Sequence, residues 1–109
     1  MNDKDLKTIN KIIEHSNAII IEVKGIKNAD DFQQNSTISK AVLFDLLQIG
    51  ELSNKLSVEY VTKSSLPWNN IYNLRNRIVH GYAGVDYQII WDTIKKDIPK
   101  LNNELKKEK

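Results

Sequence analysis

Apolar residues recur at steps of three and four positions along several stretches of this chain, which is the spacing of one face of an α-helix. The clearest stripe comes last in the sequence and comprises Tyr87, Ile90, Trp91, Ile94, Ile98, Leu101 and Leu105. Amphipathic helices joined by short connections bury such stripes against one another. The pattern therefore predicts an all-α protein, an antiparallel bundle of four to five helices. The length of 109 residues favours one domain over residues 1–109.

Polar residues before the first two stripes predict where those helices begin. Asp3 or Asp5 can cap the first helix, and Ser36 or Thr37 can cap the second. Gly50 lies inside the second stripe, where glycine costs about 1 kcal/mol relative to alanine. Either another helix approaches closely at Gly50, or the glycine has no structural role, and the sequence leaves both alternatives open.

The second half of the chain predicts three further elements. A short helix is expected over residues 60–65, and Pro67 suits the first turn of the helix that follows. Asp86 can cap the final helix. Pro99 lies inside the final stripe, so we expect it either to kink that helix or to restart it with Asp97 as a new cap.

The composition excludes several classes of protein. The absence of cysteine rules out disulfides and thiolate metal sites, and a net charge of +2 does not by itself indicate a nucleic-acid binder. The amino-terminal segment lacks the apolar core of a signal peptide, and no apolar run approaches the roughly 18 residues that span a bilayer. We therefore expect a soluble, cytoplasmic protein with no membrane partner. A glycine-rich phosphate loop is absent, and His15 has no partner at metal-ligand spacing except its neighbour Glu14, so no cofactor or metal is expected.

Both arginines of the chain and one of its two histidines lie in a single segment, "LRNRIVHGY" (residues 74–82). An arginine fork binds phosphate oxygens in a bidentate manner that lysine cannot match, and histidine moves protons near neutral pH. Arg75 could stabilise the charge of a pentacoordinate phosphate while His80 exchanges a proton with the 2′-hydroxyl or the 5′ leaving oxygen of RNA. The alternative is that Arg75 and His80 only cap a helix end.

Gly81 determines whether these side chains can meet. Arg75 and His80 lie five residues apart and would not share a face of a straight helix. Glycine is the usual residue just past a helix end, so we expect the helix to stop near His80. The chain can then turn His80 and Tyr82 back toward Arg75 and Asn76.

The segment "RNRIVHGY" matches the R-x4-H-x-Y motif and resembles HEPN-domain toxins of the HepT-like group. Three further segments extend the resemblance: Ile49-Gly50-Glu51 within residues 41–57, the Pro-Trp start of "LPWNNIYNLRN", and the proline-containing closing helix over residues 85–101.

The resemblance implies a homodimer in which two motifs face each other and form a composite, metal-independent endoribonuclease site. It also implies a type VII-like toxin–antitoxin pair with RNA as the substrate. The antitoxin would be a minimal nucleotidyltransferase, a separate chain that transfers AMP to the motif tyrosine, here Tyr82. An AMP phosphate there would compete with RNA for Arg75.

The resemblance assigns roles to individual residues. Arg75 and His80 match the catalytic pair, and Asn76 matches a polar residue that orients the pair or contacts RNA. Arg77 either contacts RNA phosphates or faces solvent. Glu51 matches a recurrent acidic position that pairs with Arg75 or another motif residue, contacts the partner, or is an ordinary surface residue.

Two other functions remain open from the sequence. The bundle could be a non-catalytic partner of a nucleotidyltransferase that holds a nucleotide, or the motif could be purely structural. Trp68, Trp91 and Tyr72 are expected to pack in the core rather than to stack on bases.

Overall fold

The computed structural model describes residues 1–79 and 84–108, and these residues form six helices and no strand. The helices are α1 (Asp3–Glu22), α2 (Ala29–Gln34), α3 (Ser36–Ser53), α4 (Val58–Lys63), α5 (Trp68–Val79) and α6 (Tyr87–Lys107). The predicted all-α fold is confirmed. None of the helices within the described ranges is both long and apolar enough to cross a membrane.

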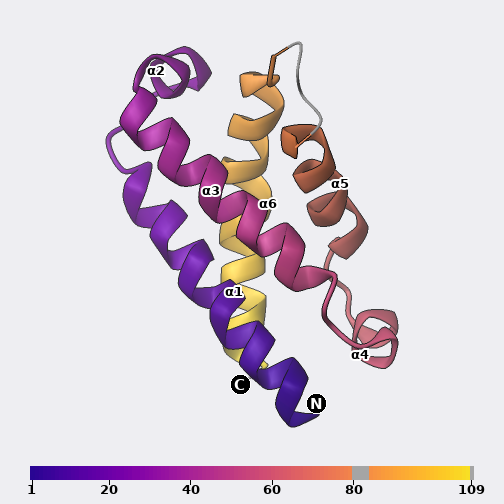
Figure 1. Ribbon diagram of the computed structural model, residues 1–109. Coiled ribbons are helices and arrows are strands. Elements are labelled where there is room, and N and C mark those ends of the chain that lie inside the picture. Colours follow the sequence, from indigo (N-terminus) through magenta and orange to yellow (C-terminus); the bar gives the residue numbers. More distant parts are fainter. Residues whose placement is uncertain (80–83, 109) are drawn as a thin grey trace.

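The four long helices alternate in direction along the chain (Figure 1). Helix α3 contacts α1 on one side and α5 on the other, and α6 packs against α1. The short helix α2 contacts α3 and α6, while α4 lies between α3 and α5 in the chain. This order makes α3 the helix that connects the body of the bundle to the arginine-containing helix α5.

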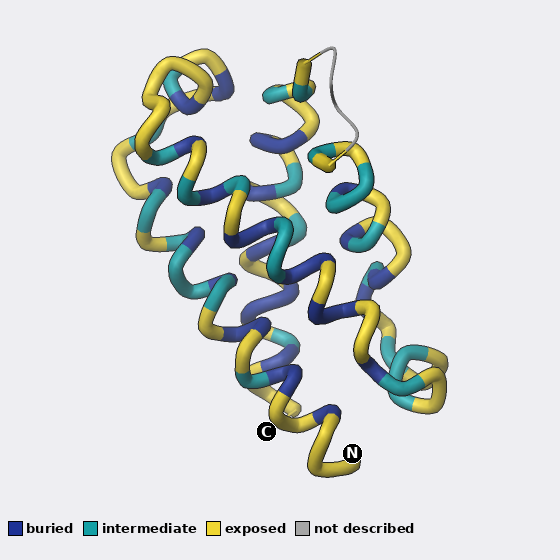
Figure 2. Tube along the Cα trace, viewed as in Figure 1, coloured by how far each residue is buried: buried dark blue, intermediate teal, exposed yellow. Residues whose placement is uncertain are grey.

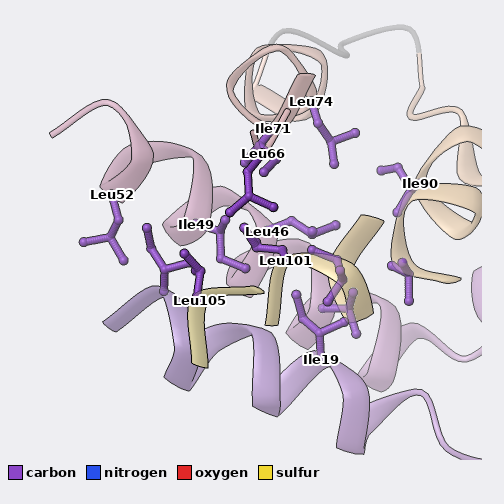
Figure 3. Packing of buried hydrophobic residues seen from close by; sticks show 14 of the residues in the cluster. Ile19, Leu46, Ile49, Leu52, Leu66, Ile71, Leu74, Ile90, Leu101 and Leu105 are labelled. Carbon is purple, nitrogen blue, oxygen red and sulfur yellow. The ribbon is translucent and has the colours of Figure 1, made fainter. Parts of the chain in front are cut away.

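The predicted stripes face inward and form one core (Figure 2). The largest completely covered side chains include Ile9, Ile12, Ile19, Phe32, Ile49, Ile94 and Leu105. Each contributes about 1.5–3 kcal/mol through removal of its apolar surface from water. In Figure 3, the side chains of Leu66, Ile71 and Leu74 point toward those of α3 and α6, so α5 is anchored by its apolar face.

Helix α1 is capped by Asn2, not by Asp3 or Asp5 as predicted. The Asn2 Oδ1 atom accepts a hydrogen bond from the Asp5 backbone N–H at 2.7 Å. A capping residue must be extended and precede the helix, whereas Asp3 and Asp5 are already helical. Asp5 is instead buried against Ser57, which donates to it from its backbone N–H at 2.9 Å and from its hydroxyl at 2.6 Å.

The cap of α3 also lies one residue earlier than predicted. The Asn35 Oδ1 atom accepts from the Ile38 backbone N–H at 3.1 Å, and Ser36 and Thr37 lie in the first turn. Asparagine caps helices as readily as serine and threonine do, and Asn35 directly precedes the two predicted residues.

The later elements agree with prediction more closely. Helix α4 begins at Val58, two residues before the predicted start, because Ser57 caps it. Pro67 lies immediately before α5 rather than in its first turn. Asp86 caps α6 as predicted, and α6 continues through Pro99, so the predicted restart at this proline is wrong.

Candidate functional site

Helices α3 and α5 approach each other closely where Gly50 faces Arg75. Gly50 is buried, and a Cβ added there would overlap the Cβ of Arg75 and lie 2.8 Å from its Cγ. Real Cβ atoms do not tolerate such distances. Of the two alternatives for Gly50, the close approach of another helix is therefore correct, and this contact fixes where the Arg75 side chain leaves α5.

The Arg75 guanidinium group is held from two sides. Its Nε donates to the Glu51 Oε1 at 2.6 Å, and its Nη2 forms an ion pair with the same carboxylate. Its Nη1 donates to the Asn76 Oδ1 at 2.9 Å. Three residues that the sequence proposed for one site thus lie in direct contact.

Tyr72 adds a contact that the sequence did not predict. The Arg75 guanidinium carbon lies 5.9 Å from the centre of the Tyr72 ring, within the range of a cation–π interaction. Tyr72 is only half-buried, unlike Trp68 and Trp91, which pack in the core as predicted. The spacing of three residues on one helix was the available signal for this contact.

The Arg75 site remains open to solvent. The Arg75 side chain is 23% exposed and that of Glu51 is 47% exposed. Ion pairs with this exposure contribute about 0–1 kcal/mol to stability, so the pair orients Arg75 more than it stabilises the fold. An anion that approaches from solvent can therefore replace the carboxylate at modest cost.

Arg77 lies away from this group. Two residues on a helix are separated by about 200°, so Arg77 leaves α5 on the side opposite Arg75. It lines a groove of about 250 Å³ between α5 and α6, together with Asn73 and Ile89. The structure therefore does not bring the two arginines together.

The remaining motif residues, His80, Gly81 and Tyr82, lie outside the described residues, as does Ala83. The described part of α5 ends at Val79. The predicted meeting of His80 and Tyr82 with Arg75 stays a prediction.

A second polar cluster, on the other side of α3, was missed. His15 Nδ1 lies 2.9 Å from Asp45 Oδ1, and the Asp45 side chain is only 10% exposed. Burial and the neighbouring Asp45 raise the pKa of Glu22 to about 7. A carboxylate inside the apolar run "AVLFDLLQIG" was the signal for this cluster, because a charge is rarely buried without a partner.

A family model and several known proteins match this chain, and all of them are described as ribonucleases. The family model described as ribonuclease HepT-like matches residues 6–108. A protein of Caldanaerobacter subterraneus subsp. tengcongensis named "Putative RNase" is 38% identical over 96 residues, which cover 87% of this chain and 85% of that protein. A Methanocaldococcus jannaschii protein with the same name is 34% identical over 107 residues, with 96% and 97% covered.

A third relative carries a more specific name. The "Probable ribonuclease HepT" of Thermococcus cleftensis is 32% identical over 79 residues, which cover 72% of each chain. No solved structure gives a significant match. The extent of the family match and these identities establish that the chain belongs to the HepT-like ribonuclease family.

Proposed function

We propose that this protein is a metal-independent endoribonuclease whose site combines Arg75 and His80 from two copies of the chain. The observation that carries the proposal is the placement of Arg75. Gly50 admits its side chain to the α3–α5 contact, and Glu51 and Asn76 orient its fork. A fork of this kind, pre-oriented and open to solvent, suits the transition-state charge of phosphoryl transfer.

The proposed reaction needs one base, one acid and one anion-stabilising group. His80 removes the proton of the RNA 2′-hydroxyl, and the 2′-oxygen attacks the adjacent phosphorus. The bond to the 5′-oxygen breaks, and this oxygen takes a proton from the second His80 of the dimer. The products are a 2′,3′-cyclic phosphate and a 5′-hydroxyl. Arg75 stabilises the negative charge of the pentacoordinate phosphate that forms on the way from substrate to products.

The homodimer supplies the second histidine in this scheme. A two-fold axis places the same surface patch on both sides of an interface, so each motif faces its own copy. A single chain has only one His80, which would have to act as both base and acid.

We further propose that a minimal nucleotidyltransferase antitoxin regulates this site by transferring AMP to Tyr82 in a type VII-like toxin–antitoxin pair. The added phosphate carries negative charge next to the Arg75 fork and would occupy the place of the RNA phosphate. Mass spectrometry after co-expression with such a partner is expected to find AMP on Tyr82 in the wild type and not in Tyr82→Phe.

The direct test is incubation of the purified protein with RNA in the presence of EDTA. We expect the wild type to cleave, and we expect Arg75→Ala and His80→Ala to lose cleavage by about 10²-fold or more. Arg77→Ala is the matched control, since it removes the other arginine of the same helix and should cleave as the wild type does. Cleavage by Arg75→Ala and His80→Ala at the wild-type rate would refute the proposed site. No cleavage by the wild type, together with binding to the nucleotidyltransferase, would favour a non-catalytic, nucleotide-holding partner.

A further inference from the structure

A second feature of the α3–α5 contact is an open pocket of about 270 Å³ that lies one helical turn from Arg75. It lies where the end of α3 and the start of α5 meet α4. Polar groups line part of it, namely the side chains of Asn54, Thr62, Asn69 and Tyr72. Because α3 and α5 are antiparallel, the contact that begins at Gly50 and Arg75 continues directly to this pocket.

The lining combines apolar side chains with hydrogen-bonding groups. Leu56, Val61 and Trp68 supply the apolar part, and the Trp68 indole N–H already donates to the Ser64 hydroxyl at 2.9 Å. The amides of Asn54 and Asn69 present both donors and acceptors. Proteins recognise single-stranded RNA bases with this combination of groups. An aromatic ring stacks on the face of the base, and polar side chains form hydrogen bonds with its edge.

The volume is compatible with a single base. It lies just below the range of about 300–1,000 Å³ that is typical of pockets for whole drug-sized ligands. The sugar and phosphate would remain outside, on the side where Tyr72 contacts Arg75.

Charge distinguishes this pocket from one near the amino terminus. That pocket, of about 430 Å³, is lined by three carboxylates, Asp5, Glu59 and Glu108, with one lysine, Lys63. An RNA strand would be repelled there. The residues that line the pocket beside Tyr72 include no acidic side chain, and the nearest charge along the helix is Arg75.

We propose that this pocket binds the nucleobase of the nucleotide next to the scissile phosphate and thereby sets the base preference of cleavage. Tyr72 links the two parts of the site, because its ring contacts the Arg75 guanidinium and lines the pocket. The assignment to a cleavage subsite rests on the ribonuclease function proposed above, whereas base binding itself does not.

The first test measures binding and needs no cleavage. The four nucleoside 3′-monophosphates and their parent nucleosides are titrated into ¹⁵N-labelled wild-type protein and followed by NMR. We expect one base to shift the Asn54 and Asn69 side-chain amides and the Trp68 indole, with tighter binding of its 3′-phosphate. Shifts confined to other regions, or none at millimolar concentration, would overturn the subsite.

Single-residue variants show whether the side chains that line the pocket cause the binding of the base. Stacking contributes about 1–3 kcal/mol per base, so Tyr72→Leu should weaken binding by roughly 5- to 100-fold. Tyr72→Phe keeps the ring and should bind more tightly than Tyr72→Leu, which separates stacking from any loss of folding. Asn69→Ala should weaken the preference for one base, whereas Asn73→Ala, on the α6 side of the same helix, should not. Equal binding by Tyr72→Leu and the wild type would overturn the proposal.

The second test sequences the ends produced from a random RNA pool. Asn69→Ala should change the base found next to the cut, and Asn73→Ala should not. If the wild type cleaves nothing while the nucleotide titration still maps to the pocket, the ribonuclease function fails and the base site stands. If cleavage occurs with an identical pattern in Asn69→Ala and Tyr72→Leu, the subsite fails and the ribonuclease function stands.

Discussion

Helix α3 forms a polar contact on each of two sides, and the two contacts differ in how far the carboxylate is exposed to solvent. Toward α1, Asp45 lies against His15 with only 10% of its side chain exposed. Toward α5, Glu51 holds Arg75 with 47% of its side chain exposed. The two carboxylates make the difference, because the His15 and Arg75 side chains are similarly exposed, at 26% and 23%. The Arg75 pair also lies near the open pocket that Tyr72 lines.

The difference shows how one helix serves both stability and binding. A buried charged group depends on its partner, because removal of the partner leaves an uncompensated charge in the interior, which costs folding free energy. An exposed pair contributes little and can exchange partners with an incoming phosphate. The α1 side therefore has a carboxylate that depends on its buried partner, while the α5 side has a carboxylate that an incoming anion can replace.

The largest effect is expected on the α5 side, from Gly50→Ala. The added Cβ overlaps Arg75, so α5 must move away from α3, at a cost of about 1–3 kcal/mol for overpacking. Chemical denaturation should show the loss of stability, and RNA cleavage should fall because Arg75 is displaced. Gln48→Ala, on the same helix, serves as the control; a Gly50→Ala protein with wild-type stability would show that the close approach is not real.

The α1 side predicts a pH dependence of stability. The pKa of Glu22 is raised to about 7 in the folded protein from an ordinary value of 4.5, so the folded state keeps a proton that the unfolded state loses. Stability should therefore fall as pH rises from about 4.5 through 7, and the full penalty applies above 7.

Glu22→Gln removes this titration and should raise the free energy of unfolding at pH 8 by on the order of 1 kcal/mol, a value reduced for the partial exposure of Glu22. Urea denaturation at several pH values measures this effect. Glu14→Gln is the control, because Glu14 is an exposed glutamate on the same helix. An unchanged pH profile in Glu22→Gln would contradict the assignment.

The α5 side predicts the smallest effect on stability. Glu51→Gln removes the charge of an exposed pair and should change the free energy of unfolding by no more than about 1 kcal/mol. Cleavage should nevertheless fall, because the Arg75 fork loses its orientation. Thermal denaturation and cleavage rates measured on one preparation separate the two effects; a large loss of stability would show that Glu51 is a structural residue.

The sequence predicted the helical class and the buried stripes because both follow from local periodicity. The sequence predicted the first residue of a helix less exactly. The segments "NDKD" and "NSTI" each contain several residues that can cap a helix, and local periodicity does not show which of them does. The contact between Glu51 and Arg75 was among its alternatives through family resemblance. The pairing of His15 with Asp45 was not predicted, because residues 30 positions apart meet only once the register of α1 against α3 is known.

The central claim is that Arg75 is positioned as a phosphate-binding fork, and Arg75→Lys tests it most directly. Lysine keeps the positive charge and much of the side-chain length but cannot bind two phosphate oxygens in the same plane. In RNA cleavage assays with EDTA, we expect Arg75→Lys to lose about 10²-fold in rate while its melting temperature stays near that of the wild type. Cleavage by Arg75→Lys at the wild-type rate would contradict the account.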